Sequence, residues 1–387
     1  MKPTNSRLTT VALSVLAMWY VVGCESGSGN GQQASSAVQY HTYNINAYPA
    51  NKVVCDPMGG GGASSPKQGI KSELYYRTQG QPRYYSAQDY VDHTTKSDQN
   101  LFFSDINVPT RLFQSGFKTQ TSDVLKDDSG NTLIEYFGLK MDTTIRLSDQ
   151  DADGDYEFAL LSDDGAILKI NQNGNWSNVV SNDGDHPTRL GCSTQKFTLN
   201  HSSQLSSELL YYQGPRYHIS NILLWRKLNS DQAAGQDQDC GNYGNNMWFD
   251  PNNNSQPTSK YQALLNRGWK VLTPANYYLP ADSTETALYN PCTAGTVPTI
   301  SDVRISELVS SDIWVNWSTD IPSTSQLMIT RVSDGNTIIT TTDNIVRTQH
   351  TIHYSGLQSN TAYQLRVINV SEDLGRAISD PIDFTTP

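Results

Sequence analysis

The stretch Tyr156–Ile170 reads YEFALLSDDGAILKI, and its adjacent pair Asp163-Asp164 is the most informative feature of the sequence. Apolar residues typical of a buried strand run up to Ser162, and a second apolar strand resumes at Ala166. Between them, the carboxylates of Asp163 and Asp164 share a tight turn. Adjacent carboxylates repel each other unless a cation or proton is held between them, and such oxygen ligands suit calcium. The alternative is an ordinary Asp-Gly turn of a β-hairpin.

Short strand-like segments surround this stretch from Ile70 to Trp225. Turn signals such as Asn173-Gly and Asp183-Gly separate them. Many short strands at this spacing predict an all-β fold, either a sandwich or a barrel. We place this domain at residues 69–230.

A second β-sandwich is predicted at residues 298–387. Trp317 is expected in its core, and Tyr363 stands where a tyrosine corner would bond back to an earlier turn. The segment resembles a fibronectin type III domain, which implies a spacer or an adhesion module. Between the two sandwiches, residues 231–297 are rich in Asn, Gln, Pro and Tyr and read as a loop-rich, disulfide-tied connecting segment. Apolar spacing in Lys260–Leu272 predicts one helix there, interrupted by Gly268.

The N-terminus predicts export. A positively charged start and an apolar stretch indicate a signal peptide at residues 1–23. Its ending, Val-Val-Gly-Cys24, resembles the bacterial lipobox, which implies a lipidated Cys24 and an outer-membrane lipoprotein of the cell envelope, exposed at the surface or facing the periplasm. The lipid would be the only membrane anchor. Residues 24–68 form a tether and linker. The alternative is a plain secretory signal, with Cys24 an incidental thiol.

The remaining cysteines are even in number, as expected in an oxidising compartment. Two disulfides are therefore predicted, and three connectivities are open among Cys55, Cys192, Cys240 and Cys292. Their spacing lacks the close pairs of a zinc site. A net charge of −11 without any basic run disfavours nucleic-acid binding. No nucleophile elbow, zinc-protease helix or phosphate loop is found, so we do not expect an enzyme.

Several separated motifs resemble the PA-fourteen domain, a β-sandwich shared by protective antigen and flocculin adhesins. These motifs are Gly69–Tyr76, Tyr156–Gly165, Val180–His186, Leu209–Gly214 and Ile222–Trp225. In the flocculin-like branch, consecutive aspartates joined by a cis peptide bind calcium, and calcium binds sugar hydroxyls. The resemblance assigns that role to Asp163 and Asp164.

The second ligand loop departs from this branch. The branch supplies an asparagine ligand after the strand that here reads Leu209–Tyr212, whereas this chain continues Gln-Gly-Pro-Arg-Tyr. Gln213 is a candidate substitute as metal ligand. Arg216 and Tyr217 are candidates for contacting the ligand, Tyr217 by stacking its ring on a sugar.

Other residues compete for a role. Asp149, Asp151 and Asp153 form the first half of an EF-hand pattern, but position twelve is not glutamate, so the choice lies between a looser calcium loop and a solvated acidic turn. Trp176 is a second candidate for stacking on a sugar. Asp183 is either a structural residue of its turn or part of the ligand site.

These features predict a surface lipoprotein that binds a glycan or glycoconjugate on a cell surface through calcium, in adhesion or recognition. The alternatives are an envelope lipoprotein that contacts protein partners without binding glycan, and an accessory module of a glycan-active complex.

Overall fold

The computed structural model describes residue 48 and residues 52–280 and 289–387, except residues 61, 64, 113, 115, 117, 120–123, 128, 216, 294, 373 and 374. Regular structure in them is almost entirely β-strand, which confirms the all-β class. No helix in this part of the chain has the length and apolar character needed to cross a membrane. The predicted signal peptide and Cys24 lie outside the described residues.

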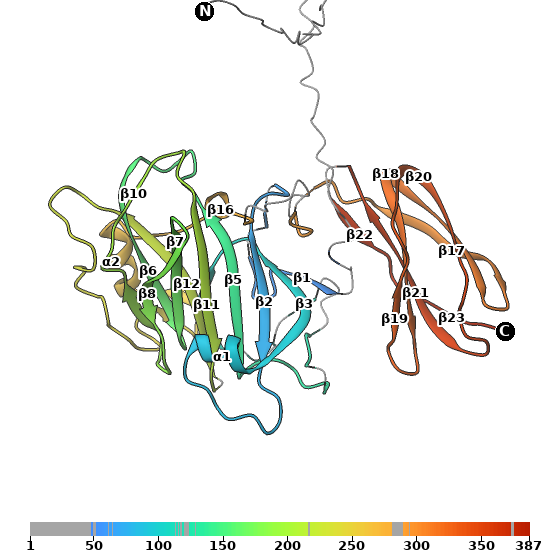
Figure 1. Ribbon diagram of the computed structural model, residues 1–387, viewed down its shortest axis with the longest axis horizontal. Helices are drawn as coiled ribbons and strands as arrows, with labels where there is room; N and C mark the ends of the chain where they lie inside the picture. Colours follow the sequence, from blue (N-terminus) through green and yellow to red (C-terminus); the bar gives the residue numbers. More distant parts are fainter. Residues whose placement is uncertain are drawn as a thin grey trace, which may run out of the picture. The chain divides into compact units, whose positions relative to one another are not determined.

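The central region contains two sheets that pack face to face (Figure 1). The first has the order β1 (Val53–Cys55), β3 (Thr95–Phe103), β2 (Ile70–Tyr76), β5 (Phe137–Ile145), β11 (Leu205–Gln213), β7 (Ala166–Gln172) and β8 (Asn175–Asn182), with β16 (Tyr277–Tyr278) also paired to β5. The second has the order β10 (Phe197–Leu199), β6 (Gly154–Asp163), β12 (His218–Lys227) and β15 (Lys270–Val271), with β4 (Asn107–Leu112) paired to β12 and β9 (Arg189–Cys192) paired to β6.

The main core lies between these sheets. On β11, Leu209 and Tyr211 point into it together with Phe158 and Trp225 of the second sheet, and all four side chains are buried. Leu210 on the same strand points to the opposite face and is buried too. A strand covered on both faces reads as a continuous apolar run, which explains the sequence Leu-Leu-Tyr-Tyr at this place.

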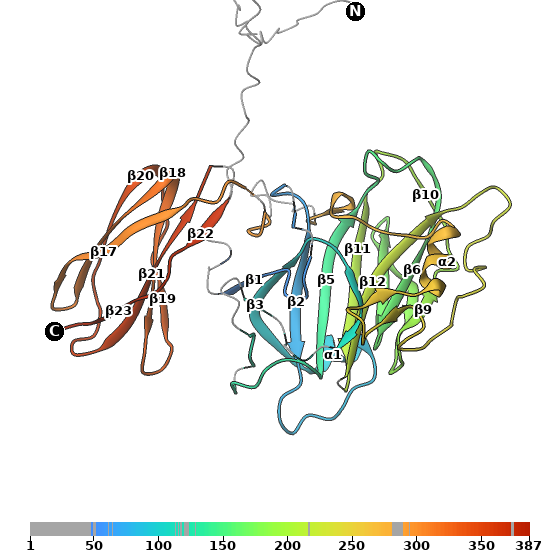
Figure 2. The ribbon, with the colours of Figure 1, turned by 180° about the vertical axis from the view of Figure 1, so that it is seen from behind.

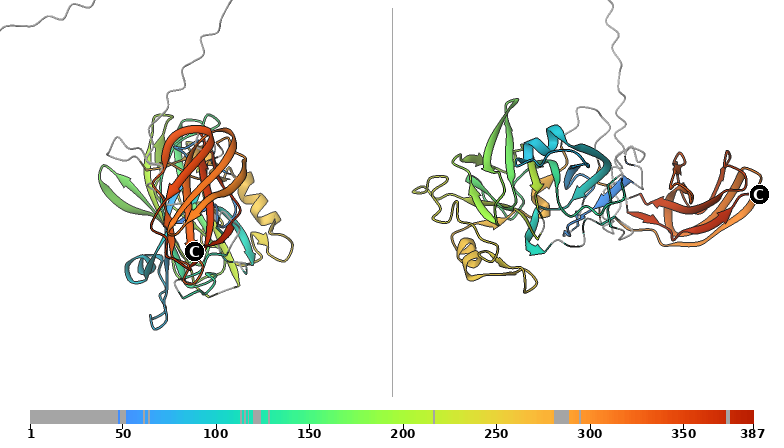
Figure 3. Two further views of the ribbon diagram at one scale, coloured as in Figure 1. Left: turned by 90° about the vertical axis from the view of Figure 1, so that its right-hand side faces the viewer. Right: turned by 90° about the horizontal axis from the view of Figure 1, so that it is seen from below.

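Two helices cover the outer faces of the sandwich. Helix α1 (Ala87–His93) packs through Tyr90 against Tyr212 of the first sheet. Helix α2 (Ser259–Asn266) packs through Leu264 against the second sheet, beside β6 and β9 (Figure 2). In the view from below, the two helices lie on opposite sides of the strand layers (Figure 3). Helix α2 covers the first half of the helix predicted in Lys260–Leu272; it ends at Asn266, before Gly268, and Lys270–Val271 is strand β15.

Residues 231–297 take part in the central sandwich. β15 pairs with β12 and β16 pairs with β5, so this segment adds a strand to each sheet. Trp248 and Trp269 are buried against the outer face of the second sheet. The segment also contains β13 (Phe249–Asp250), β14 (Gln256–Pro257) and the 3-10 helix η2 (Pro274–Asn276).

The two predicted disulfides are present. One joins Cys55 to Cys292 and the other joins Cys192 to Cys240. They tie the strands of the central region to the two ends of the segment 231–297.

The C-terminal residues form their own strands. β18 (Asp312–Arg331) pairs with β17 (Ile300–Val309), β19 (Thr337–Ile339), β20 (Asp343–Tyr354) and β21 (Ala362–Val370), and β21 pairs with β22 (Arg376–Ile378) and β23 (Ile382–Thr385). Trp317 is buried in their core. The hydroxyl of Tyr363 accepts a hydrogen bond from the backbone N–H of Gln358 at 3.0 Å, which is the bond expected of a tyrosine corner.

Candidate functional site

The Asp163–Asp164 pair lies where the chain passes from one sheet to the other. Asp163 is the last residue of β6 in the second sheet, and β7 of the first sheet begins at Ala166. The two strands belong to different sheets, so the hairpin-turn alternative is wrong. The peptide bond between the two aspartates is cis.

Two loops meet the crossover through hydrogen bonds to the two aspartates. The Asp164 carboxylate accepts bonds from the backbone N–H of His186 at 3.1 Å and of Gly214 at 2.8 Å. The Asp163 carboxylate accepts a bond from the Thr188 hydroxyl at 3.4 Å, and its backbone carbonyl accepts one from the Tyr211 hydroxyl at 2.6 Å. The pair is therefore fixed by the loops that follow β8 and β11.

The residue after the pair must be glycine. A Cβ atom on Gly165 would lie 2.4 Å from Cε1 of Tyr212 and 2.5 Å from Oδ1 of Asp183. Both contacts are far inside van der Waals distance, so no larger residue fits without displacement of the neighbouring loop. The glycine lets the loop that carries Asp183 close against the crossover.

A cavity of about 310 Å³ opens beside the pair. Its walls include both aspartates, which are each only 6% exposed, together with Asp185, Tyr217, His218 and Asn245. The ring of Tyr217 is 71% exposed and stands at the cavity. The site is thus a polar hollow with an accessible aromatic face.

Both carboxyl groups hold protons more tightly than usual. Burial, together with the adjacent charge of Asp164, raises the pKa of Asp163 from 3.8 to about 8. Burial also raises the pKa of Asp164 to about 6, although the N–H groups of Gly214 and His186 favour its charged form. Two neighbouring carboxyl groups with raised pKa values are suited to exchange protons for a bound cation.

Asp185 adds a third carboxylate to the cavity, but its oxygens are engaged. It forms an ion pair with Arg83 and accepts a bond from the Tyr212 hydroxyl at 2.7 Å. Arg83 also lies over the ring of Tyr85, with its guanidinium carbon 4.7 Å from the ring centroid. Asp185 therefore anchors Arg83 at the cavity.

The donors at the crossover fit a calcium ion in kind. Asp163 and Asp164 supply hard, anionic oxygens. Asn245 lines the same cavity, and its amide oxygen is buried and accepts no hydrogen bond from the described residues. Among those residues, no three His, Cys, Asp or Glu side chains gather closely enough to hold a metal by themselves. Neutral oxygens would have to complete the shell, and calcium accepts such ligands.

Gln213 does not belong to this donor set. Its side chain is 1% exposed, and its amide oxygen accepts a bond from the Tyr211 hydroxyl at 2.7 Å. Its amide nitrogen donates to the carbonyls of Pro215 and His218. Both the oxygen and the nitrogen of its amide are engaged in these hydrogen bonds, so Gln213 does not fit the role of metal ligand. Arg216 lies outside the described residues.

Two other predicted ligand-site residues, Trp176 and Asp183, are not among the residues that line the cavity. Trp176 is half exposed near the start of β8, and the loop beside the aspartates follows the end of that strand, roughly 20 Å away. Asp183 has a structural role, because its carboxylate accepts a bond from the Ala87 N–H at 2.9 Å, at the start of α1.

The separate calcium loop is not supported either. Asp151 forms an ion pair with Lys270 and accepts bonds from Ser148 and Asn276. Asp153 instead pairs with His201 at 2.8 Å. Asp149 is exposed, so the three carboxylates serve different partners. They also precede β6, whereas Asp163 ends it.

Asn245 is the residue that the sequence did not single out. It belongs to a segment with many asparagines, and nothing in its spacing separates it from its neighbours. Only the fold brings this segment to the cavity.

No protein-family model and no curated protein matches the sequence. Parts of the chain resemble solved structures. The PA14 sugar-binding domain from an RTX adhesin matches at 21% identity over 46% of this chain and 99% of that one, with a TM-score of 0.29. The PA14 domain of the antifreeze protein MpAFP matches at 17% identity over 43% and 85%, with a TM-score of 0.31. The A domain of epithelial adhesin 6 from Candida glabrata, solved with Galβ1-3GlcNAc, matches at 14% identity over 51% and 96%, with a TM-score of 0.30. Likenesses at this level do not assign the chain to a family.

Proposed function

We propose that this protein binds carbohydrate through a calcium ion held by Asp163 and Asp164. The observation that carries the proposal is the placement of two adjacent, buried carboxyl groups with raised pKa values in the wall of an open cavity. Buried carboxylates this close are costly unless a cation or protons neutralise them.

A bound calcium ion would supply an electrophilic centre for pairs of sugar hydroxyls. The chain's own residues would do the rest. Asp164 would hold the loops of His186 and Gly214 in place through its two backbone bonds. The exposed ring of Tyr217 would pack on the apolar face of a pyranose.

We further propose a binding role without catalysis. Glycosidase carboxylates face each other across a cleft, about 5 Å or more apart. Asp163 and Asp164 instead follow each other on one crossover.

A glycan array in calcium and in chelator tests the proposal. We expect binding of a defined glycan set in calcium and its loss in chelator. The double variant Asp163→Asn, Asp164→Asn should lose binding, whereas Asp149→Asn, an exposed aspartate away from the cavity, should retain it. Chelator-insensitive binding, or capture of an envelope protein with no sugar bound at all, would contradict the proposal.

Anchoring through Cys24 completes the proposed role. Lipidation would present the described domains at the surface of the envelope. The variant Cys24→Ser should move the protein from the membrane fraction to the soluble fraction. Continued membrane association of that variant would contradict the anchor.

A further inference from the structure

The loop that follows Cys240 is fastened beside the Asp pair. The Cys192–Cys240 disulfide joins its start to the end of β9. Further along, the backbone N–H of Gly244 donates to the carbonyl of Thr188 at 2.9 Å. The hydroxyl of Thr188 in turn donates to Asp163. The loop is therefore linked to the site through a single intervening residue.

Asn245, the next residue, lines the cavity, and its side chain has an unused acceptor. Its Oδ1 atom is buried, and no described residue donates a hydrogen bond to it. A buried amide oxygen without a donor is unfavourable and rare in folded proteins, and an ion or an ordered water is the usual explanation. The residue that carries this oxygen lines the same cavity as Asp163 and Asp164, which suits an ion better than an isolated water.

We propose that Asn245 supplies the neutral oxygen ligand of the calcium ion held by Asp163 and Asp164. This inference rests on the proposed function. Asn245 takes the place of Gln213, whose side-chain amide is already hydrogen-bonded to Tyr211, Pro215 and His218. The ligand thus comes from the segment 231–297, and not from the loop between β11 and β12 in which the sequence predicted it.

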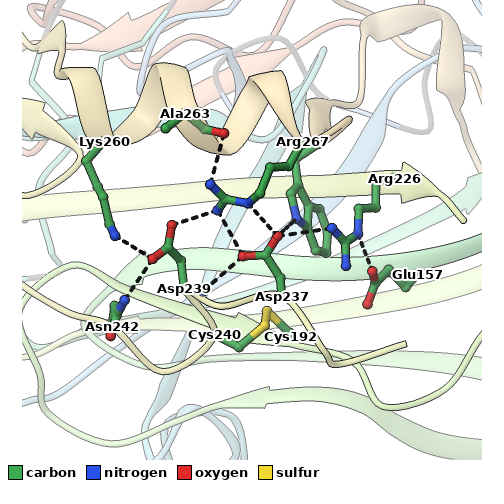
Figure 4. A network of polar contacts seen from close by, with 11 residues as sticks. Glu157, Cys192, Arg226, Asp237, Asp239, Cys240, Asn242, Lys260, Ala263 and Arg267 are labelled. Carbon is green, nitrogen blue, oxygen red and sulfur yellow. Dashed lines mark hydrogen bonds and ion pairs between the residues drawn. A yellow bond between two sulfur atoms is a disulfide. The ribbon is translucent and has the colours of Figure 1, made fainter. Parts of the chain in front are cut away.

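A buried polar network holds the segment that carries Asn245 (Figure 4). Asp237 accepts bonds from Arg226 at 3.0 Å and from Arg267 at 2.9 Å, and Arg226 also pairs with Glu157. Asp239 accepts bonds from Arg267 at 2.6 Å, from Lys260 at 2.5 Å and from the amide nitrogen of Asn242 at 2.9 Å. The network, the adjacent disulfide and the bond from Gly244 to Thr188 hold the backbone that leads into Asn245.

Calcium titration calorimetry on the purified protein tests this role, together with melting temperatures in calcium and in chelator. The variant Asn245→Ala should bind calcium at least about tenfold more weakly, as expected for loss of a metal-supporting group. Its exposed neighbour provides the matched control, and Asn246→Ala should bind calcium as the unaltered protein does. In chelator, Asn245→Ala should melt no lower than the unaltered protein, because it removes an acceptor that has no partner. If Asn245 only stabilised the fold, Asn245→Ala would melt lower in chelator and would bind calcium with unchanged affinity.

A carboxylate of the same shape provides the rescue. Asn245→Asp should retain calcium binding even where Asn245→Ala fails to fold, and loss of binding in Asn245→Asp would overturn the inference. Equal calcium affinity in Asn245→Ala and the unaltered protein would also overturn it, while the Asp163–Asp164 site would stand. Absence of calcium binding by the unaltered protein would overturn both the inference and the proposed function.

Discussion

Replacing Asp163 by asparagine should stabilise the calcium-free protein while abolishing its response to calcium. The amide keeps the shape of the side chain and an oxygen that can accept the bond from Thr188. It removes the group that must be protonated or neutralised when the chain folds. The effect is unusual, since most substitutions of buried residues destabilise.

The size of the effect follows from the pKa of Asp163, which is about 8 in the folded protein against an ordinary 3.8. Between these values the folded state binds the proton more tightly than the unfolded state, so stability falls as pH rises from about 4 to about 8. At pH 7 the difference of roughly three pKa units corresponds to at most about 4 kcal/mol. Coupling to Asp164 divides this cost between the two groups. We therefore expect Asp163→Asn to raise the free energy of unfolding at pH 7 by about 2–4 kcal/mol. Such a gain corresponds to a rise in melting temperature of roughly 5–10 °C.

Thermal unfolding in chelator at pH 5, 6, 7 and 8 measures the difference. We expect the melting temperature of Asp163→Asn to exceed that of the unaltered protein increasingly with pH, and calcium to raise only the latter. Asp149→Asn, an exposed aspartate, serves as the control and should track the unaltered protein. A variant that melts lower at pH 7, or a difference that does not change with pH, would refute the reasoning.

Three further outcomes are expected. Calcium affinity should rise between pH 6 and pH 8, because the ion must displace protons from Asp163 and Asp164. Calorimetry in buffers of different ionisation enthalpy should detect the released protons. An affinity that does not change with pH would count against direct binding to the pair. Gly165→Ala should lower the free energy of unfolding by about 1–3 kcal/mol in urea denaturation, since its Cβ would collide with Tyr212, and an unchanged midpoint would contradict this close approach. Tyr217→Ala should weaken glycan binding and leave calcium affinity unchanged; a parallel loss of both would assign the ring to the metal site instead.

The strands were predictable because each carries its own signal. The apolar run Tyr156–Leu161 predicts a buried strand, and the turn residues at Asp163 predict where it ends. The even number of cysteines left after Cys24 likewise predicted two disulfides, and both are present. It did not fix the pairing, because Cys55 and Cys292 are separated by 237 positions and meet only in the folded chain.

The site was predictable only in part, because its remaining members depend on tertiary contacts. Helix α1 is seven residues long, and its first N–H is held by Asp183 from a distant loop. Such a short helix has little stability of its own. Asn245 carries no local signal, since its importance comes from the loop that the Cys192–Cys240 disulfide fastens beside the cavity.

A crystal structure of the protein grown with calcium would show whether the ion binds at the Asp163–Asp164 crossover. We expect one ion in the cavity, about 2.3–2.6 Å from carboxylate oxygens of both aspartates and from Oδ1 of Asn245. Crystals grown in saturating calcium in which both aspartates hold only their hydrogen bonds to Thr188, His186 and Gly214, with no ion beside them, would contradict it.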